Sequence, residues 1–182
     1  MSDISVLLRK FAGGDESAYE ALYSGIYAEL RSLAASAMRR ERPDHTLQAT
    51  ALVNEAWIRL VGSPASWESK AEFLRASAKI MREILVDHAR NRGRLKRGGD
   101  WQRVEMHDPV SLAVLDPETL TLLDSALQKL NARDPRSRQI VELRYFAGLS
   151  SEETAQVMNL SVKTVTRDWN FARAWLEKEL RG

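Results

Sequence analysis

Apolar residues recur at helical spacing along much of the chain. In the segment "DESAYEALYSGIYAELRSLAASAMRRER", which begins at Asp15 after two glycines, apolar side chains follow one another every three or four residues (Ala18, Leu22, Ile26, Leu30, Leu33). The helix that this spacing predicts ends before Pro43, because a residue that precedes proline is disfavoured in the α region. Alternating apolar and polar residues, the pattern of a half-buried strand, form no run of useful length. The sequence therefore predicts an all-α fold.

Two more helices are predicted in the first half of the chain, and a linker follows them. The segment "TALVNEAWIRLVG" ends with Gly62, at the position after a helix where glycine is favoured. After a short loop, "SPASWES", a long helix runs from Lys70 to about Gly93. Beyond it the periodicity is lost, and glycines and a proline interrupt the chain. We predict two helical domains joined by a linker: residues 1–94, the linker 95–117, and residues 118–182.

The second half of the chain marks its own helix boundaries. "DPETL" and "DPRSR" each place aspartate at an N-cap and proline at the first helical position, where the missing N–H is not needed. Ser150 and Glu153 have the spacing of a capping box, Ser161 is a further N-cap, and Gly148 fits a left-handed C-cap. Four helices are predicted: residues 117 to about 130, 135 to 148, 151–158, and from the Ser161 cap to about 180.

A turn of only three residues, Asn159 to Ser161, separates the last two helices. Asparagine tolerates the left-handed conformation that such a turn requires, and Leu160 can fill the angle between the helices. This is the geometry of a helix-turn-helix, whose second helix enters the major groove of DNA with its N-terminal part. The alternative is an αα-hairpin whose polar face is only solvated.

The last helix has two unlike faces. Val165, Trp169, Ala172 and Leu176 form one apolar stripe. The opposite face carries donors suited to base edges and phosphates, so we predict base contacts from Lys163, Thr164, Thr166 and Arg167, with Asn170 on the same face and a phosphate contact from Arg173. Asp168 would repel phosphates unless it accepts from a cytosine amino group or pairs with a neighbouring arginine.

Positive charge is concentrated in the middle of the chain. The formal net charge of the whole chain is +2, whereas residues 73–103 hold nine Lys/Arg against three acids, a net of +6. On the long helix, Arg75, Lys79, Arg82 and Arg90 project away from an apolar face, and Trp67 lies in the loop before it. A cationic track beside an aromatic residue suits single-stranded or locally opened nucleic acid. The alternatives are a solvated basic segment and a core role for Trp67 and Phe73, which we favour for Phe73.

Other kinds of site find little support. The chain has no cysteine, and its three histidines, His45, His88 and His107, lie far apart, so no metal or cofactor is expected. No nucleophile–base constellation can be assembled from spacing, which argues against an enzyme. The sequence contains no apolar run long enough to span a membrane and no signal-peptide layout, so a cytoplasmic location is expected.

The whole chain resembles a bacterial RNA polymerase sigma factor of the extracytoplasmic-function (ECF) type. "TLQATALVNEAWIRLVG" resembles the helix that docks on the β′ clamp helices, and "FLRASAKIMREILVDHARNRGRLKRGGDWQRV" resembles the part that melts and reads the −10 element. "LRYFAGLSSEETAQVMNLSVKTVTRDWNFARAWL" resembles the helix-turn-helix that reads the −35 element. The "ALV·EA" and "KRGG·W·RV" signatures are similar to those of an ECF-like subgroup from planctomycetes and acidobacteria.

The resemblance implies roles for individual residues and for partners. It places Asn54, Glu55, Trp57 and Arg59 on the polymerase-docking helix, with Asn54 where other ECF factors commonly have glutamine. It assigns −10 contacts to the loop and basic helix (Trp67, Arg75, Lys79, Arg82, Arg90, Arg92 and Arg94), and capture of a flipped base to the loop "GSPASWESKAEF". The implied partners are core RNA polymerase (β′ clamp helices and β flap), promoter DNA and, in many members, an anti-sigma factor.

Two competing interpretations make different predictions. A conventional helix-turn-helix regulator would be a dimer that binds a palindromic site tightly without polymerase. A helical adaptor or anti-sigma-like protein would bind only proteins, and Arg167→Ala and Lys163→Ala would leave its activity unchanged.

Overall fold

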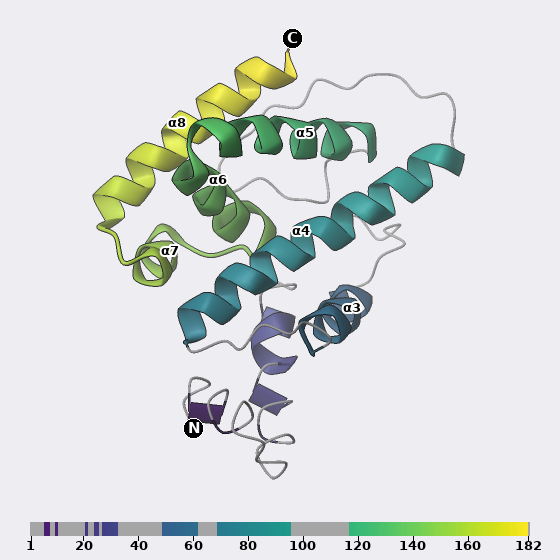
Figure 1. Ribbon diagram of the computed structural model, residues 1–182, viewed down its shortest axis with the longest axis vertical. Helices are drawn as coiled ribbons and strands as arrows, with labels where there is room; N and C mark the ends of the chain where they lie inside the picture. The colour runs from purple at the N-terminus through teal and green to yellow at the C-terminus, as the bar shows by residue number, and fades with distance from the viewer. Residues whose placement is uncertain are drawn as a thin grey trace.

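The protein is all-α in the part of the chain that the computed structural model describes, which confirms the predicted fold class. That part comprises residues 6, 7, 10, 21, 24, 25, 27–32, 49–61, 69–95 and 117–181. With the labels of Figure 1, its helices are α3 (Ala49–Val61), α4 (Lys70–Leu95), α5 (Pro117–Arg133), α6 (Pro135–Val141), the π-helix η2 (Glu142–Phe146), α7 (Ser151–Met158) and α8 (Val162–Leu180).

The long helix α4 is the centre of the arrangement. It packs against α3 on one side and against α5, η2 and α7 on the other, so it lies between the N-terminal and C-terminal helices (Figure 1). Helix α8 in turn packs against α5, α6 and α7. The helices predicted to form two separate domains are therefore in direct contact through α4.

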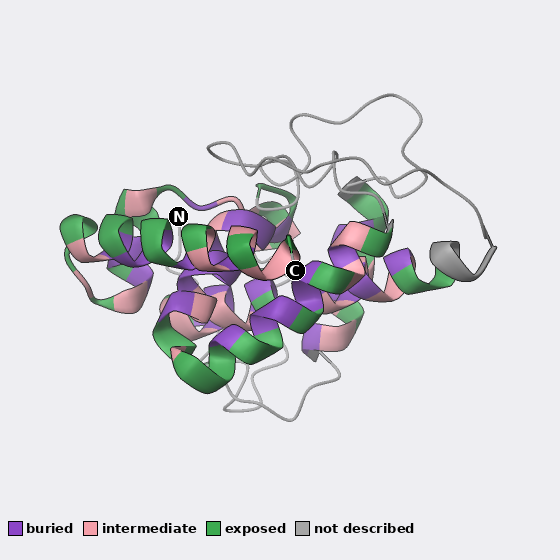
Figure 2. Cartoon of the chain, turned by 90° about the horizontal axis from the view of Figure 1, so that it is seen from above, coloured by how far each residue is buried: buried purple, intermediate pink, exposed green. Residues whose placement is uncertain are grey.

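The apolar core is also shared between the two predicted domains. One buried cluster joins Leu52, Phe73 and Met81 to Leu143 and Leu149 of the second half. A second cluster adds Val86 and Ala89 of α4 to the interior of the C-terminal helices. Buried residues form stripes along the helices, and exposed residues occupy their outer sides (Figure 2). Phe73 is fully buried, which confirms the core role predicted for it.

Most of the predicted helix boundaries in the second half are confirmed. Asp134 accepts hydrogen bonds from the backbone N–H groups of Arg136 and Ser137, each at 3.1 Å, and so caps α6. Burial alone would raise the pKa of Asp134, but the hydrogen bonds from Ser137 and the charge of Arg136 outweigh it and lower the pKa. Gly148 has a φ of 68°, the left-handed conformation predicted for a glycine cap.

One predicted helix has a different geometry. Residues 135–148 were expected to form a single α-helix, but after Val141 the chain widens into η2, where Ala147 N–H donates to Glu142 C=O at 3.2 Å. The wider turn has a visible consequence for packing. Leu143 and Ala147 join the first apolar cluster while Tyr145 and Phe146 join the second, so one short segment contributes to both. Burial also raises the pKa of the Tyr145 phenol strongly.

Several predictions fall outside the described residues. They concern Trp67, His45 and His107, residues 96–116 of the linker, and the side chains of Arg92 and Arg94, whose backbone belongs to α4. Within the described ranges, no helix is both long and apolar enough to cross a membrane. The same part of the chain contains no group of three histidine or acidic residues arranged to hold a metal ion.

Candidate nucleic-acid interface

The segment from α7 to α8 has a fixed geometry because its helix ends are capped. Ser150 and Glu153 form the predicted capping box, with N–H···O distances of 3.1 and 2.7 Å. Asn159 adopts the left-handed conformation (φ 52°, ψ 48°), and Leu160 N–H donates to Ala155 C=O at 2.9 Å. Ser161 then accepts from Thr164 N–H at 3.1 Å and caps α8. The start of α8 is thus held in one orientation relative to α7.

Burial fixes the rotation of α8 about its own axis. Val165, Trp169, Ala172 and Leu176, the predicted apolar stripe, are all buried. The Arg144 guanidinium lies over the Trp169 ring, 4.5 Å from its centroid, and adds a cation–π contact on the inner side of the helix. The opposite side of α8 therefore faces outward.

The outward side of α8 carries most of the residues predicted to contact DNA. Lys163, Thr166, Arg167 and Asn170 are exposed, at positions i, i+3, i+4 and i+7 of one helical face. Thr164 is only partly exposed, and its hydroxyl lies 2.8 Å from that of Ser161 at the helix start. Arg173 is partly buried, with its Nε 3.9 Å from Glu177. The structure thus brings four of the six predicted residues together on one accessible face. Thr164 and Arg173 lie at the edges of this face.

The structure explains how an acidic residue, Asp168, is tolerated on a helix predicted to face DNA. Its side chain is buried, and it forms ion pairs with Arg136 of α6 at 2.8 Å and with Arg167 at 2.9 Å. Of the two alternatives, the structure shows the pairing with a neighbouring arginine, and a second arginine joins from a distant position in the sequence. The three side chains together carry one net positive charge, so Asp168 does not make the outer face of α8 acidic.

The basic helix α4 differs from its prediction at Arg82. This residue was expected on an open cationic face, but only 7% of it is exposed. Its guanidinium contacts Asp124 of α5, Glu142 of η2 at 2.8 Å and Glu83 at 3.6 Å. The prediction of an accessible Arg82 is wrong for this conformation, because its two buried partners lie 42 and 60 residues away in sequence. No helical pattern within α4 could reveal them.

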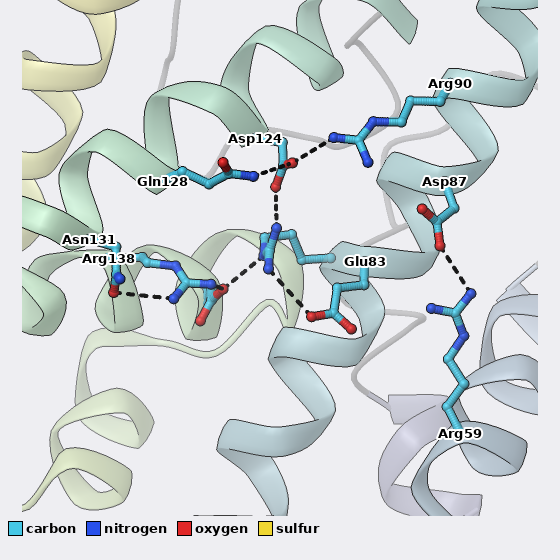
Figure 3. Close-up of polar contacts among 10 residues, drawn as sticks. Arg59, Glu83, Asp87, Arg90, Asp124, Gln128, Asn131 and Arg138 are labelled. Carbon is cyan, nitrogen blue, oxygen red and sulfur yellow. Dashed lines mark hydrogen bonds and ion pairs between the residues drawn. The ribbon is translucent and has the colours of Figure 1, made fainter. Parts of the chain in front are cut away.

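Other polar side chains extend this buried cluster. Arg90 of α4 also reaches Asp124, at 3.0 Å, and Gln128 donates to the same carboxylate at 3.2 Å (Figure 3). Arg138 donates to Glu142 at 2.8 Å. Of the remaining cations predicted on α4, Lys79 is exposed and Arg75 is partly exposed. The carboxylates of the C-terminal half therefore cover part of the predicted nucleic-acid surface of α4.

Helix α3 presents its predicted docking residues on different sides. Asn54 is exposed, whereas Trp57 is half-buried against the first apolar cluster. Arg59 donates to Glu55 at 2.8 Å and to Asp87 of α4 at 3.2 Å, as Figure 3 shows for Asp87. Burial alone would lower the pKa of Arg59, but the hydrogen bonds to these two carboxylates outweigh it and raise the pKa. Arg59 thus also joins α3 to α4, as does Glu55, whose Oε2 lies 3.1 Å from Nε2 of His88 on α4.

Two exposed apolar residues were missed by the sequence reasoning. Ile58 of α3 is 69% exposed and lies one turn after Asn54. Phe171 of α8 is 42% exposed and lies one turn after Arg167. Their spacing could have indicated exposure, because neither residue falls on the buried stripe of its own helix. Large apolar residues on the same side as predicted contact residues are candidates for the same interfaces.

Comparison with known proteins and families assigns the chain to a family. A comparison with curated proteins gives no match. A family model described as "ECF sigma factor" matches residues 1–182, the full length of the sequence. Proteins of this family are DNA-binding transcription initiation factors without enzymatic activity, and they act together with core RNA polymerase and promoter DNA. The chain therefore belongs to the ECF sigma factor family.

Proposed function

We propose that this protein is a promoter-specificity subunit that binds core RNA polymerase, reads two promoter elements and opens the DNA at one of them. The observation that carries the proposal is the outward face of α8, where Lys163, Thr166, Arg167 and Asn170 are exposed opposite a buried apolar stripe. We assign the −35 element to residues 118–182 and the −10 element to residues 1–94, with residues 95–117 as the connection.

Within the −35 assignment, α7 and α8 act as the helix-turn-helix. Lys163 and Arg167 are suited to guanine O6 and N7, Asn170 to adenine, and Thr166 to either base edge or a thymine methyl group. Arg173, Arg136 and Thr164, at the edges of this face, contact phosphates. Asp168 is a positioning residue, because its buried carboxylate accepts from Arg167 Nε at 2.9 Å and limits the conformations of that side chain.

The polymerase-docking surface is assigned to the exposed side of α3. Asn54 and Glu55 supply polar contacts to the β′ clamp helices, and Ile58 supplies apolar area beside them. Trp57 and Arg59 support this surface from behind, since one packs on the core and the other pairs with Asp87. The C-terminal helices contact the β flap, as the family resemblance implies.

For the −10 element, the cations of α4 form the phosphate track. Arg75, Lys79 and Arg90 belong to it, together with Arg92, Arg94 and Trp67 of the preceding loop. Arg82 joins this track only when it is released from Asp124 and Glu142. Stacking on an aromatic residue and backbone contacts offset the unstacking cost of a flipped base, which is a few kcal/mol. We also propose action in the cytoplasm, where bacterial polymerase works, control by an anti-sigma factor, and kinship with the planctomycete and acidobacterial subgroup.

Run-off transcription tests the proposal. Bacterial core RNA polymerase is incubated with a pool of genomic promoter fragments, with and without the protein. We expect transcripts that start at defined sites only when the protein is present, and their upstream sequences give both promoter elements. Arg167→Ala should lose these transcripts, whereas Lys178→Ala, an exposed cation in the last turn of α8, should retain them.

A different result would favour the competing interpretation. If no transcript depends on the protein, while the chain binds a palindromic duplex tightly as a dimer without polymerase, the proposed function is wrong. The outward face of α8 would then belong to a conventional regulator.

A further inference from the structure

The strongest unexplained feature is the pairing of α4 cations with acids from the other half of the chain. Arg82 and Arg90 lie on the predicted phosphate track, yet both reach the carboxylate of Asp124, and Arg82 also reaches Glu142. A carboxylate and a phosphate offer guanidinium the same kind of partner, an anionic pair of acceptor oxygens. The acids therefore occupy the arginine donors that DNA would use.

The carboxylates in these ion pairs are buried, unlike those of ordinary surface ion pairs. Asp124 is 3% exposed and Glu142 is 5% exposed, and each accepts from two arginines. Val86 and Ala89 of α4 share a buried apolar cluster with the C-terminal helices on the same side of α4. Water is thus largely excluded from the ion pairs of Arg82 with Asp124 and Glu142, whereas the Arg90 side chain is 46% exposed. DNA cannot reach Arg82 while α5 and η2 stay in place.

We propose that Asp124 and Glu142 act as an internal substitute for DNA phosphates and hold the chain in a closed state. Arg82 and Arg90 cannot bind the −10 element with the same guanidinium donors while those donors bind the two acids. Use of the α4 surface therefore requires α4 to separate from α5 and η2. This inference rests on the proposed function for the identity of the competing ligand, but the closed state itself does not depend on it.

Under the proposed function, the spacing of the two promoter elements gives a second reason for opening. Elements centred near −10 and −35 are about 25 base pairs apart, or about 85 Å along B-form DNA at about 3.4 Å per base pair. A compact chain of 182 residues has a radius of gyration of about 16 Å and is about 40 Å across. The 21 residues between Leu95 and Pro117 can span about 70 Å at full extension, so the connection permits separation.

The closed state leaves the other nucleic-acid surface accessible. Lys163, Thr166, Arg167 and Asn170 of α8 are exposed while Arg82 is covered. The free protein can therefore contact duplex DNA through α8 alone, and the α4 track becomes available only after opening.

Energy transfer between two dyes measures the opening. The chain has no cysteine, so Asn91→Cys on α4 and Ala132→Cys on α5, both at exposed positions, provide the only labelling sites. We expect high transfer in the free protein and a clear decrease when core polymerase and a promoter fragment are added. Transcripts from the same labelled sample show that the complex is functional.

Neutral isosteres of the two acids test their role directly. Asp124→Asn with Glu142→Gln removes both carboxylate charges and leaves Arg82 without an anionic partner from the C-terminal half. The matched control is Glu152→Gln with Glu179→Gln, which makes the same change in net charge, because Glu152 is exposed on α7 and Glu179 pairs with Lys129 within the C-terminal half. We expect lower energy transfer in the free Asp124/Glu142 variant and no change in the control.

The salt dependence of DNA binding provides a second readout. Each added phosphate contact steepens the slope of log K against log salt concentration by about 0.9 for duplex DNA and about 0.7 for single strands. Freeing Arg82 and Arg90 should therefore steepen the slope for a single-stranded fragment by about 1.4 relative to the control variant. Circular dichroism confirms that both variants keep their helix content.

The outcomes separate this inference from the proposed function. Unchanged transfer and slope in a folded Asp124/Glu142 variant contradict the inference. If that variant does not fold, energy transfer in the labelled protein with both acids intact tests the inference. High transfer in a complex that makes specific transcripts would also contradict the inference. If the acids prove to close the chain but no transcript depends on the protein, the closed state stands and the proposed function fails.

Discussion

The two basic surfaces of this protein, the outer face of α8 and the cationic side of α4, differ in what their charges contact. On α8, Lys163 and Thr166 are exposed, and the one buried acid nearby, Asp168, is matched by two arginines. On α4, Arg82 is buried against two acids from α5 and η2. Similar numbers of cations in a sequence can therefore mean an open surface in one place and an internal contact in another.

The comparison is sharpest for two cations of the same helix. Arg82→Leu removes the guanidinium between Asp124 and Glu142 and leaves both acids in a buried site. Because Arg90 and Arg138 still partner them, we expect a loss of roughly 3 kcal/mol in the free energy of unfolding, the lower end for a broken buried pair. Lys79→Leu, at an exposed position of α4, should change it by less than about 0.5 kcal/mol. Urea denaturation compares them, and equal effects would mean that the buried cluster contributes nothing.

On α8, substitutions should separate base contacts from phosphate contacts. Arg167→Ala should weaken binding to a specific site by about 1–3 kcal/mol and relax the preference at one base pair. Arg173→Ala should weaken binding to all sequences alike and reduce the salt slope by about 0.9. Selection from a randomised duplex library with the reconstituted holoenzyme measures both. If Arg167→Ala weakens binding equally for all sequences, Arg167 contacts the DNA phosphates and not a base.

The role of Asp168 gives a smaller effect of a particular kind. Asp168→Asn removes the charge that orients Arg167, so discrimination at the base pair read by Arg167 should fall by about 1 kcal/mol, or roughly fivefold. Glu152→Gln, an exposed acid on α7, makes the same change in net charge and should leave that preference intact. If both variants alter the preference equally, the effect is one of net charge and not of positioning.

The smallest expected effect concerns a purely local device, the N-cap of α6. Asp134→Ala should lower the free energy of unfolding by about 0.5–1 kcal/mol at pH 7. The pKa of Asp134 is lowered by folding, so its stabilisation is present above the ordinary value of 3.8 and is lost as the pH falls from that value through the lower pKa of the folded state. Urea midpoints of the wild type and the variant should differ at pH 7, and the difference should shrink as the pH falls through the pKa of Asp134 in the folded protein. A constant difference would show that the carboxylate charge is not involved.

Which features could be predicted from the sequence depends on how far apart in the chain the interacting residues lie. The caps of α6, α7 and α8, the left-handed Asn159 and the buried stripe of α8 depend on residues within one or two helical turns, and all were predicted. The burial of Arg82 depends on partners up to 60 positions away, and residues of the π-helix pack in two apolar clusters together with residues of α4. No local pattern contains either contact. Ile58 and Phe171 were missed because their spacing places them off the buried stripe of each helix but does not show what an exposed apolar residue contacts.

Site-directed cleavage of promoter DNA tests the central assignment of surfaces most directly. An iron chelate attached to Asn91→Cys on α4 or to Lys178→Cys on α8, in a chain without other cysteines, cuts DNA near its own position. In the holoenzyme complex we expect α4 to direct cuts near the −10 element and α8 to direct cuts near the −35 element, about 25 base pairs upstream. Cleavage by both at a single location, or by α8 alone in a transcribing complex, would contradict the account.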